Sequence, residues 1–156
     1  MAKAAAPRHT YDVHEQDCPM SERAVADRFE ACLRGSKEFS ADVLQFLARR
    51  SADAQAKWAQ ASVEAGRVIF QPWSMEIVFV LAIAKEARFG ELQHMLGGIS
   101  SRTLSDKLQT LREEGLIERE VFDEQPVRIA YRLTKEGRMT ASLATPLFAH
   151  LNHRKM

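Results

Sequence analysis

Hydrophobic residues recur three and four positions apart through most of the chain, and at every second position in two short segments between residues 116 and 134. The helical spacing predicts a first helix from Ser21 to Arg34, ended by Gly35. A second, longer helix is predicted from after Ser40 to about Ala65. Its heptad-like stripe comprises Leu44, Leu47, Ser51, Ala54, Trp58, Ala61 and Ala65. Because such a helix is marginal alone, we expect it to pack against another helix of the same or a second subunit.

A different pattern begins at Ser74, which is placed to cap the helix MEIVFVLAIA. This helix is apolar nearly all round, so it must lie at the centre of a core. A compact helix, ELQHML, follows Gly90, and the pair Gly97-Gly98 predicts a tight turn. Ser100 is the expected cap of the next helix, SSRTLSDKLQTLREE, which Gly115 ends.

Two alternating segments, LIEREVF and VRIAYRLT, flank the turn DEQP. A period of two on both sides of a short turn predicts a β-hairpin. Thr134 precedes a final helix that contains Pro146, a residue that should kink or interrupt it. One ridge of this helix carries Met139, Leu143, Leu147 and Leu151.

Together these elements predict a mainly α fold with a small β-hairpin wing: a winged helix-turn-helix with an N-terminal helical extension. We expect a flexible arm over residues 1–19 and a helical extension over 20–72 that serves dimerisation. The DNA-binding winged helix-turn-helix is expected over 73–140. The C-terminal helix, 141–156, is expected to contribute to dimerisation as well.

The helix after Gly98 has the composition of a recognition helix. Leu104, Leu108 and Leu111 anchor one side in the core, while short hydroxyl residues with an Arg and a Lys occupy the other. Such residues suit base edges and phosphates. The predicted DNA-contacting residues are Ser100, Ser101, Arg102, Thr103, Ser105, Asp106, Lys107, Gln109 and Thr110, with Arg128 near the wing tip. The alternative for the three basic residues is that they are solvated surface charges.

The segment RFGELQHMLGGISSRTLSDKLQTLREEGLIEREVF, followed by PVRIAYRLTKEGR, resembles the HxlR family of regulators within the MarR-like superfamily. The matching positions are Phe89 to Leu92, Gly98 to Ser100, Leu104 to Leu111, Gly115 to Arg119 and Pro126 to Gly137, and Trp73-Ser74 resembles the start of the family's first core helix. The resemblance covers residues 73 to about 151. It implies homodimers that bind near-palindromic operators, with dimer contacts from helices flanking the motif.

The family often has a Cys-Pro pair shortly before its tryptophan, and in some members that cysteine is a redox sensor. Here Cys18-Pro19 precedes Trp73 by 55 residues (73 − 18) and lacks neighbouring Lys or Arg. Cys18 is therefore a candidate redox sensor whose position departs from the family pattern. Cys32, on an apolar helix face, is expected to be a small core residue. His9, His14 and Cys18 could together form a metal site, but ligands in a flexible arm are weak evidence for one, so we predict no metal and no cofactor.

The net charge of +1, from 22 basic and 21 acidic residues, does not by itself suggest DNA. It leaves open an alternative function, an adaptor or machinery subunit that uses the winged helix for protein contacts. No phosphate-binding loop, nucleophile elbow or catalytic carboxylate pair is present, so we do not expect an enzyme. No apolar run approaches the ~20 residues of a membrane span, and a cytoplasmic location is expected. The predicted function is a homodimeric, sequence-specific transcriptional regulator of double-stranded DNA, open to a small-molecule or redox effector.

Overall fold

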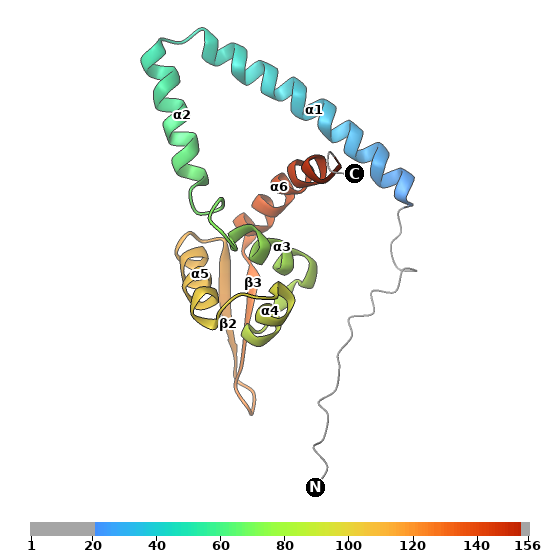
Figure 1. Ribbon diagram of the computed structural model, residues 1–156, viewed down its shortest axis with the longest axis vertical. Helices are drawn as coiled ribbons and strands as arrows, with labels where there is room; N and C mark the ends of the chain where they lie inside the picture. Colours follow the sequence, from blue (N-terminus) through green and yellow to red (C-terminus); the bar gives the residue numbers. More distant parts are fainter. Residues whose placement is uncertain (1–20, 154–156) are drawn as a thin grey trace. The chain divides into compact units, whose positions relative to one another are not determined.

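The computed structural model describes residues 21–153 (Figure 1). The chain divides into two compact units, Met1–Ser40 and Ala41–Met156. Six helices and three strands are described, in the order α1 (Glu22–Ala48), α2 (Ala52–Gly66), α3 (Ser74–Ala84), β1 (Glu86–Ala87), α4 (Phe89–Leu96), α5 (Ser101–Glu113), β2 (Ile117–Phe122), β3 (Arg128–Leu133) and α6 (Lys135–His153). The predicted fold class, mainly helical with a small antiparallel sheet, is confirmed.

The break between the two N-terminal helices lies at residues 49–51 rather than at Gly35, so the predicted boundary is wrong. Gly35 lies inside α1, where a glycine costs about 1 kcal/mol relative to alanine and the long helical run on both sides tolerates it. The actual break is capped: Ser51 Oγ accepts a hydrogen bond from the Ala54 N–H at 3.3 Å. The Gln55 side chain donates to the carbonyl oxygens of Leu47 and Arg50, at 3.2 and 3.0 Å. These side chains satisfy the backbone groups that a helix end leaves free.

Neither α1 nor α2 contributes to a core. From residue 23 to residue 66 no side chain is buried, and Leu44 and Trp58 of the predicted stripe are exposed. Cys32 is exposed as well, so its predicted place in a core is wrong. The expected helical partner for this extension is therefore not supplied by the part of the chain that the structure describes.

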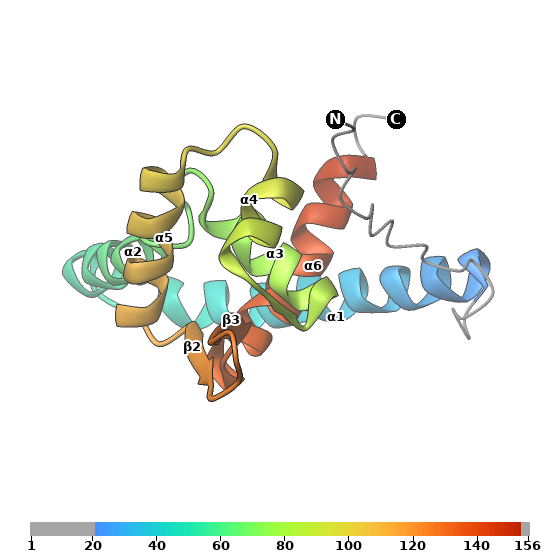
Figure 2. The ribbon, with the colours of Figure 1, turned by 90° about the horizontal axis from the view of Figure 1, so that it is seen from below.

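Helix α3 is the centre of the folded core, as its apolar sequence predicts. Ile77, Val78 and Leu81 are buried, and α3 contacts α4, α6 and β3 (Figure 2). Ser74 is not the cap, contrary to the prediction: Trp73 holds that position in a left-handed conformation with φ 71°. Ser74 is instead the first helical residue, and its buried hydroxyl has no hydrogen-bond partner among the described residues.

The predicted hairpin forms, and it belongs to a three-stranded antiparallel sheet in the order β1-β3-β2. In the hairpin, Ile117 pairs with Leu133 and Val121 with Ile129, so the alternating residues lie on the expected faces. The third strand, β1, pairs with β3 and ends before Arg88. The tip of the hairpin projects beyond the helices (Figure 1).

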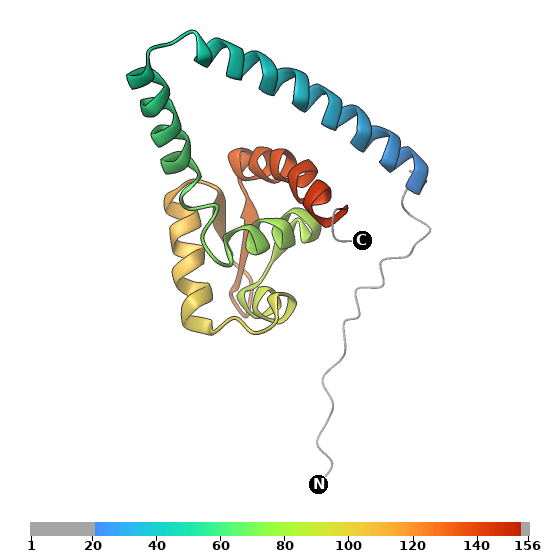
Figure 3. The ribbon, with the colours of Figure 1, turned by 45° about the horizontal axis from the view of Figure 1, so that its top comes forward.

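Helix α6 runs from Lys135 to His153 and includes Pro146 without interruption. Its inner face packs on α3 (Figure 3). There the Phe148 ring meets the Phe79 ring edge to face at a centroid distance of 5.2 Å. The four apolar residues of its outer ridge, Met139, Leu143, Leu147 and Leu151, are all exposed. No helix within residues 21–153 is both long and apolar enough to cross a membrane.

Candidate nucleic-acid interface

The turn between α4 and α5 is built by two glycines and held by one glutamine. Gly97 and Gly98 have φ of 53° and 88°, which residues with a Cβ rarely adopt. The Gln93 side chain donates to the carbonyl oxygen of Ile99 at 3.3 Å and to Ser101 Oγ at 2.9 Å. The side chain of Ile99 is buried. The direction in which α5 leaves the turn is therefore set by backbone geometry, by hydrogen bonds and by burial.

Ser100 caps α5, as predicted. Its Oγ accepts a hydrogen bond from the Thr103 N–H at 3.1 Å and lies 2.8 Å from Thr103 Oγ1. The first turn of α5 carries no acidic side chain. Because the N-terminus of a helix has a partial positive charge, this end of α5 presents a surface that favours phosphate.

The two sides of α5 differ as the sequence predicts. Leu104, Leu108 and Leu111 are buried. The predicted contact residues that are exposed are Ser100, Ser101, Arg102, Ser105, Asp106 and Gln109, and those that are half-buried are Thr103, Lys107 and Thr110. Within residues 21–153, Arg102 has no ion-pair partner. Arg102, in the first turn of α5, is therefore free to meet a phosphate or a base edge.

Several predicted contact residues already have partners within the chain. Lys107 Nζ donates to Gln71 Oε1 at 2.6 Å. Gln109 donates to Glu113 Oε1 at 2.9 Å, and Thr110 Oγ1 donates to the carbonyl oxygen of Asp106 at 3.0 Å. The sequence could not reveal the first of these contacts, since Gln71 and Lys107 lie 36 residues apart.

Arg128 lies at the start of β3, and its side chain is only 24% exposed. Its guanidinium pairs with Glu86 at 3.1 Å and with Glu124 at 3.8 Å. It also lies over the Phe122 ring, 3.7 Å from the centroid. Arg128 thus ties β1, the hairpin turn and β2 together, a role that the sequence did not show.

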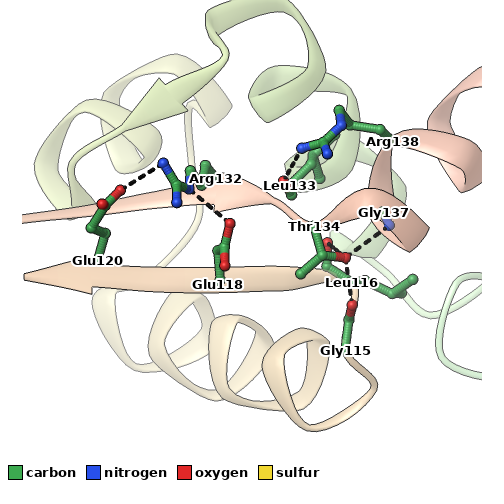
Figure 4. Close-up of polar contacts among 9 residues, drawn as sticks. All are labelled: Gly115, Leu116, Glu118, Glu120, Arg132, Leu133, Thr134, Gly137 and Arg138. Carbon is green, nitrogen blue, oxygen red and sulfur yellow. Dashed lines mark hydrogen bonds and ion pairs between the residues drawn. The ribbon is translucent and has the colours of Figure 1, made fainter.

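A second ion-pair group lies on the wing (Figure 4). The Arg132 guanidinium bonds Glu118 at 2.7 Å and Glu120 at 2.9 Å. The hydrogen bond that Arg132 donates to Glu118, together with the charges of both carboxylates, raises the pKa of Arg132. The charges of two wing carboxylates are thereby partly compensated on the exposed face of the sheet, which reduces the repulsion that they would exert on a nearby phosphate.

The base of the wing is bonded to the first turn of α6 (Figure 4). Thr134 Oγ1 lies 2.6 Å from the carbonyl oxygen of Gly115 and 3.2 Å from that of Leu116, and it accepts a hydrogen bond from the Gly137 N–H at 3.1 Å. A Cβ added at Gly137 would overlap the carbonyl oxygen of Leu116. The sequence shows Thr134 as the start of a helix, but it does not show that Gly137 is needed for this close approach.

A core helix, a helix-turn-helix and a two-stranded wing, in this order along the chain, define a winged helix-turn-helix. The model of the HxlR-like helix-turn-helix family matches residues 68–153, more than half of the chain. The protein therefore belongs to the HxlR family, as the resemblance predicts.

Known relatives agree with this assignment. The HTH-type transcriptional regulator YvaP of Bacillus subtilis is 38% identical over 76 residues, which are 49% of this chain and 69% of YvaP. YodB, an HTH-type transcriptional regulator of the same organism, is 34% identical over 65 residues, 42% of this chain and 57% of YodB. A solved structure from Enterococcus faecalis V583, assigned to the MarR family of transcriptional regulators, is similar with a TM-score of 0.53 and 33% identity. That match covers 61% of this chain and 86% of the other.

Cys18, His9 and His14 lie outside the residues that the structure describes. Within residues 21–153, no group of three or more His, Cys, Asp or Glu side chains is placed to hold a metal ion.

Proposed function

We propose that the protein is a sequence-specific, homodimeric transcriptional regulator that inserts α5 into the major groove of its operator. One observation carries this proposal: α5 buries three leucines and exposes on its other side short polar residues and the unpaired Arg102. Arginine is the residue that most often reads a guanine edge, and hydroxyl side chains bond either bases or phosphates. As with its relatives, we propose action by binding rather than catalysis.

Arg102 is the basic residue that we expect to contribute most to DNA affinity. Lys107 and Arg128 remain proposed contacts, but each would have to leave an intramolecular partner, Gln71 or Glu86, to reach DNA. The free energy lost when such an intramolecular contact breaks offsets part of the free energy gained from a new contact with phosphate. The proposed roles of Ser100, Ser101, Thr103 and Ser105 are bonds to phosphates or base edges at the N-terminal half of α5.

The homodimer is the second part of the proposal. The exposed ridge of α6 continues through four residues, each four positions from the next, and apolar rows of this kind mark protein interfaces. Pairing two chains by a two-fold axis would place two α5 helices in successive major grooves about 34 Å apart. A near-palindromic operator follows from that symmetry.

The proposal is tested by selecting bound sequences from random duplex DNA at a stated salt concentration. Enrichment of a near-palindrome by the wild-type protein, and its loss in the Arg102→Ala variant, would support the proposed function. The competing function is an adaptor that uses the winged helix for protein contacts. It is suggested by the near-neutral charge, and failure to enrich any sequence would favour it.

A small-molecule or redox effector is the remaining part of the proposal. YodB has been solved in a quinone-bound form, and its likeness to this chain, at 22% identity and a TM-score of 0.52, concerns the fold alone. In this chain Cys18 is the candidate sensor. If Cys18 senses oxidants, the Cys18→Ser variant should keep its operator affinity after treatment with diamide, whereas the wild-type protein should lose it.

A further inference from the structure

Helix α1 carries an apolar stripe that nothing in the described chain buries. The stripe is the residue set Val25, Phe29, Cys32, Ser36, Phe39, Val43 and Phe46, at alternating steps of four and three. This is the heptad spacing of a coiled coil. Val25, Phe39 and Phe46 are 49%, 71% and 56% exposed, and no residue from 23 to 48 is buried. A helix about 40 Å long with an open apolar seam needs a partner to be stable in water.

From this stripe and the charges beside it, we propose that the α1 helices of two chains pair antiparallel as a coiled coil. In such a pair the first and fourth heptad positions of one helix meet the fourth and first positions of the other. Phe29 then faces the partner's Phe39, and Val25 faces the partner's Val43. At the middle, Cys32 faces the partner's Ser36. Large side chains thus meet in the outer layers and small ones at the centre, where the helices can approach closely.

The charges beside the stripe fix the antiparallel direction. Arg28 and Asp42 lie on the same flank, each directly before a stripe residue. In the antiparallel pair, Arg28 lies beside the partner's Asp42 and Asp42 beside the partner's Arg28, which forms two ion pairs by symmetry. Within residues 21–153 neither has an ion-pair partner. In a parallel pair the same positions would lie beside the partner's Leu33 and Leu47, and no ion pair would form.

The occupant of the stripe is therefore a second copy of this chain. A partner with an unrelated sequence would need an acid and a base at matching distances, whereas this helix supplies both itself. The proposal does not depend on DNA binding, because α1 lies outside the winged helix-turn-helix. It goes beyond the dimer contact proposed for α6, because it gives α1 a partner and a register of its own.

The central layer allows a direct test by disulfide formation in the full chain. In a Cys18→Ser background, the antiparallel pair places Cys32 beside the partner's residue 36 and away from the partner's Cys32. Adding Ser36→Cys should convert most of the protein to a covalent dimer under mild oxidation, read by non-reducing electrophoresis. Cys32 and a cysteine at 36 in one helix are about 5 to 6 Å apart at Cβ, too far for a link within the chain. The matched control is Lys37→Cys, one position along, outside the stripe.

Peptide mapping by mass spectrometry then identifies the linked residues. Links between Cys32 and the cysteine at 36 would confirm the antiparallel register. Links of each cysteine to its own copy would show a parallel pair and overturn the proposal. A yield of covalent dimer no higher than that of the Lys37→Cys control would also overturn it, and would leave the α6 ridge as the alternative partner of α1.

Charge reversal gives a second, independent readout in the Ser36→Cys protein. Arg28→Asp places two acids beside each other at both ends of the pair, and should lower the rate of cross-linking about tenfold. Adding Asp42→Arg should restore the rate, because the ion pairs re-form with exchanged partners. No fall in the single variant, or no recovery in the double variant, would contradict the antiparallel register. All these measurements are made without DNA, so Arg102→Ala should leave them unchanged even where it abolishes operator binding.

Discussion

Thr134 Oγ1 lies 2.6 Å from the carbonyl oxygen of Gly115, so the residue that caps α6 is also bonded to the turn that ends α5. The Thr134 N–H donates to the carbonyl oxygen of Leu116 at 3.0 Å, which adds a backbone bond at the same place. Three elements meet at this point: the end of α5, the start of β2 and the first turn of α6. The position of α5 relative to α6 is thereby fixed through hydrogen bonds as well as through the core.

Gly137→Ala should destabilise the protein strongly. A Cβ at this position would overlap the carbonyl oxygen of Leu116 and would press on the Leu133 side chain. The backbone must shift to relieve the overlap, and we expect a loss of about 3 kcal/mol in the free energy of unfolding. Urea denaturation followed by circular dichroism measures this change.

Gly90→Ala is the matched control, since Gly90 also lies in the first turn of a helix. A Cβ there meets nothing within 4 Å, and its φ is not positive. Alanine should therefore leave stability unchanged or raise it by up to about 1 kcal/mol. Equal effects of the two substitutions would show that the contact of Gly137 with Leu116 is not a constraint.

Thr134→Val keeps the shape of the side chain and removes its hydroxyl. The Gly137 N–H loses its acceptor and the Gly115 carbonyl loses a donor. We expect a fall of about 1 to 2 kcal/mol in the free energy of unfolding. Thr134→Ser, which retains the oxygen, should be close to wild type, and a valine variant as stable as the wild-type protein would show that the hydroxyl does not contribute to stability.

Arg102→Ala should raise the dissociation constant for the selected operator about tenfold, because Arg102 is an unpaired cation in the first turn of α5. Fluorescence anisotropy at fixed salt measures it, with circular dichroism to show that the fold is retained. Arg112→Ala is the control, because Arg112 is exposed on the same helix but lies about 15 Å further along its axis. If both variants bind alike, the N-terminal half of α5 does not enter the groove.

Leu143→Glu should weaken the proposed dimer. Leu143 is 70% exposed on α6, and a glutamate in an apolar interface would be desolvated without a partner in both chains. Light scattering should show a shift toward the monomer mass at concentrations where the wild-type protein is dimeric. Val121→Glu changes a similarly exposed apolar residue on the wing and should leave the mass unchanged. A dimer that survives Leu143→Glu would exclude the α6 ridge as its principal interface.

The segment from α3 to α6 could be predicted because its sequence signals are local. Period-two alternation predicts β2 and β3, and Gly98 and Gly115 lie where a positive φ is required. The cap of α5 is formed by Ser100 and the N–H of Thr103, which lie only three residues apart. Elements of this kind are determined by residues close to one another along the chain, so they can be predicted from a single sequence.

The sequence-based predictions that were wrong concern features that depend on contacts distant in sequence, or positions where two local signals compete. Gly35 resembles a helix end, but a glycine inside α1 costs less free energy than ending the helix there would. Ser74 resembles a cap, but Trp73 takes the turn in a left-handed conformation and packs against the core. In the same way, the sequence predicts a DNA-contacting Arg128 near the wing tip, whereas its side chain is half-buried and bonded to Glu86, 42 residues earlier.

The bond between Thr134 and Gly115 also has a consequence for how a signal could travel. In a dimer joined through α6, each α5 would move together with its own α6 as a rigid unit. The separation of the two α5 helices would then depend on the angle between the two α6 helices. A small rotation at the dimer axis would then change which operator spacing fits, with no change in any DNA-contacting residue. Spacing selectivity would in that case reside in the joint between the wing and α6, and not in the residues that read the bases.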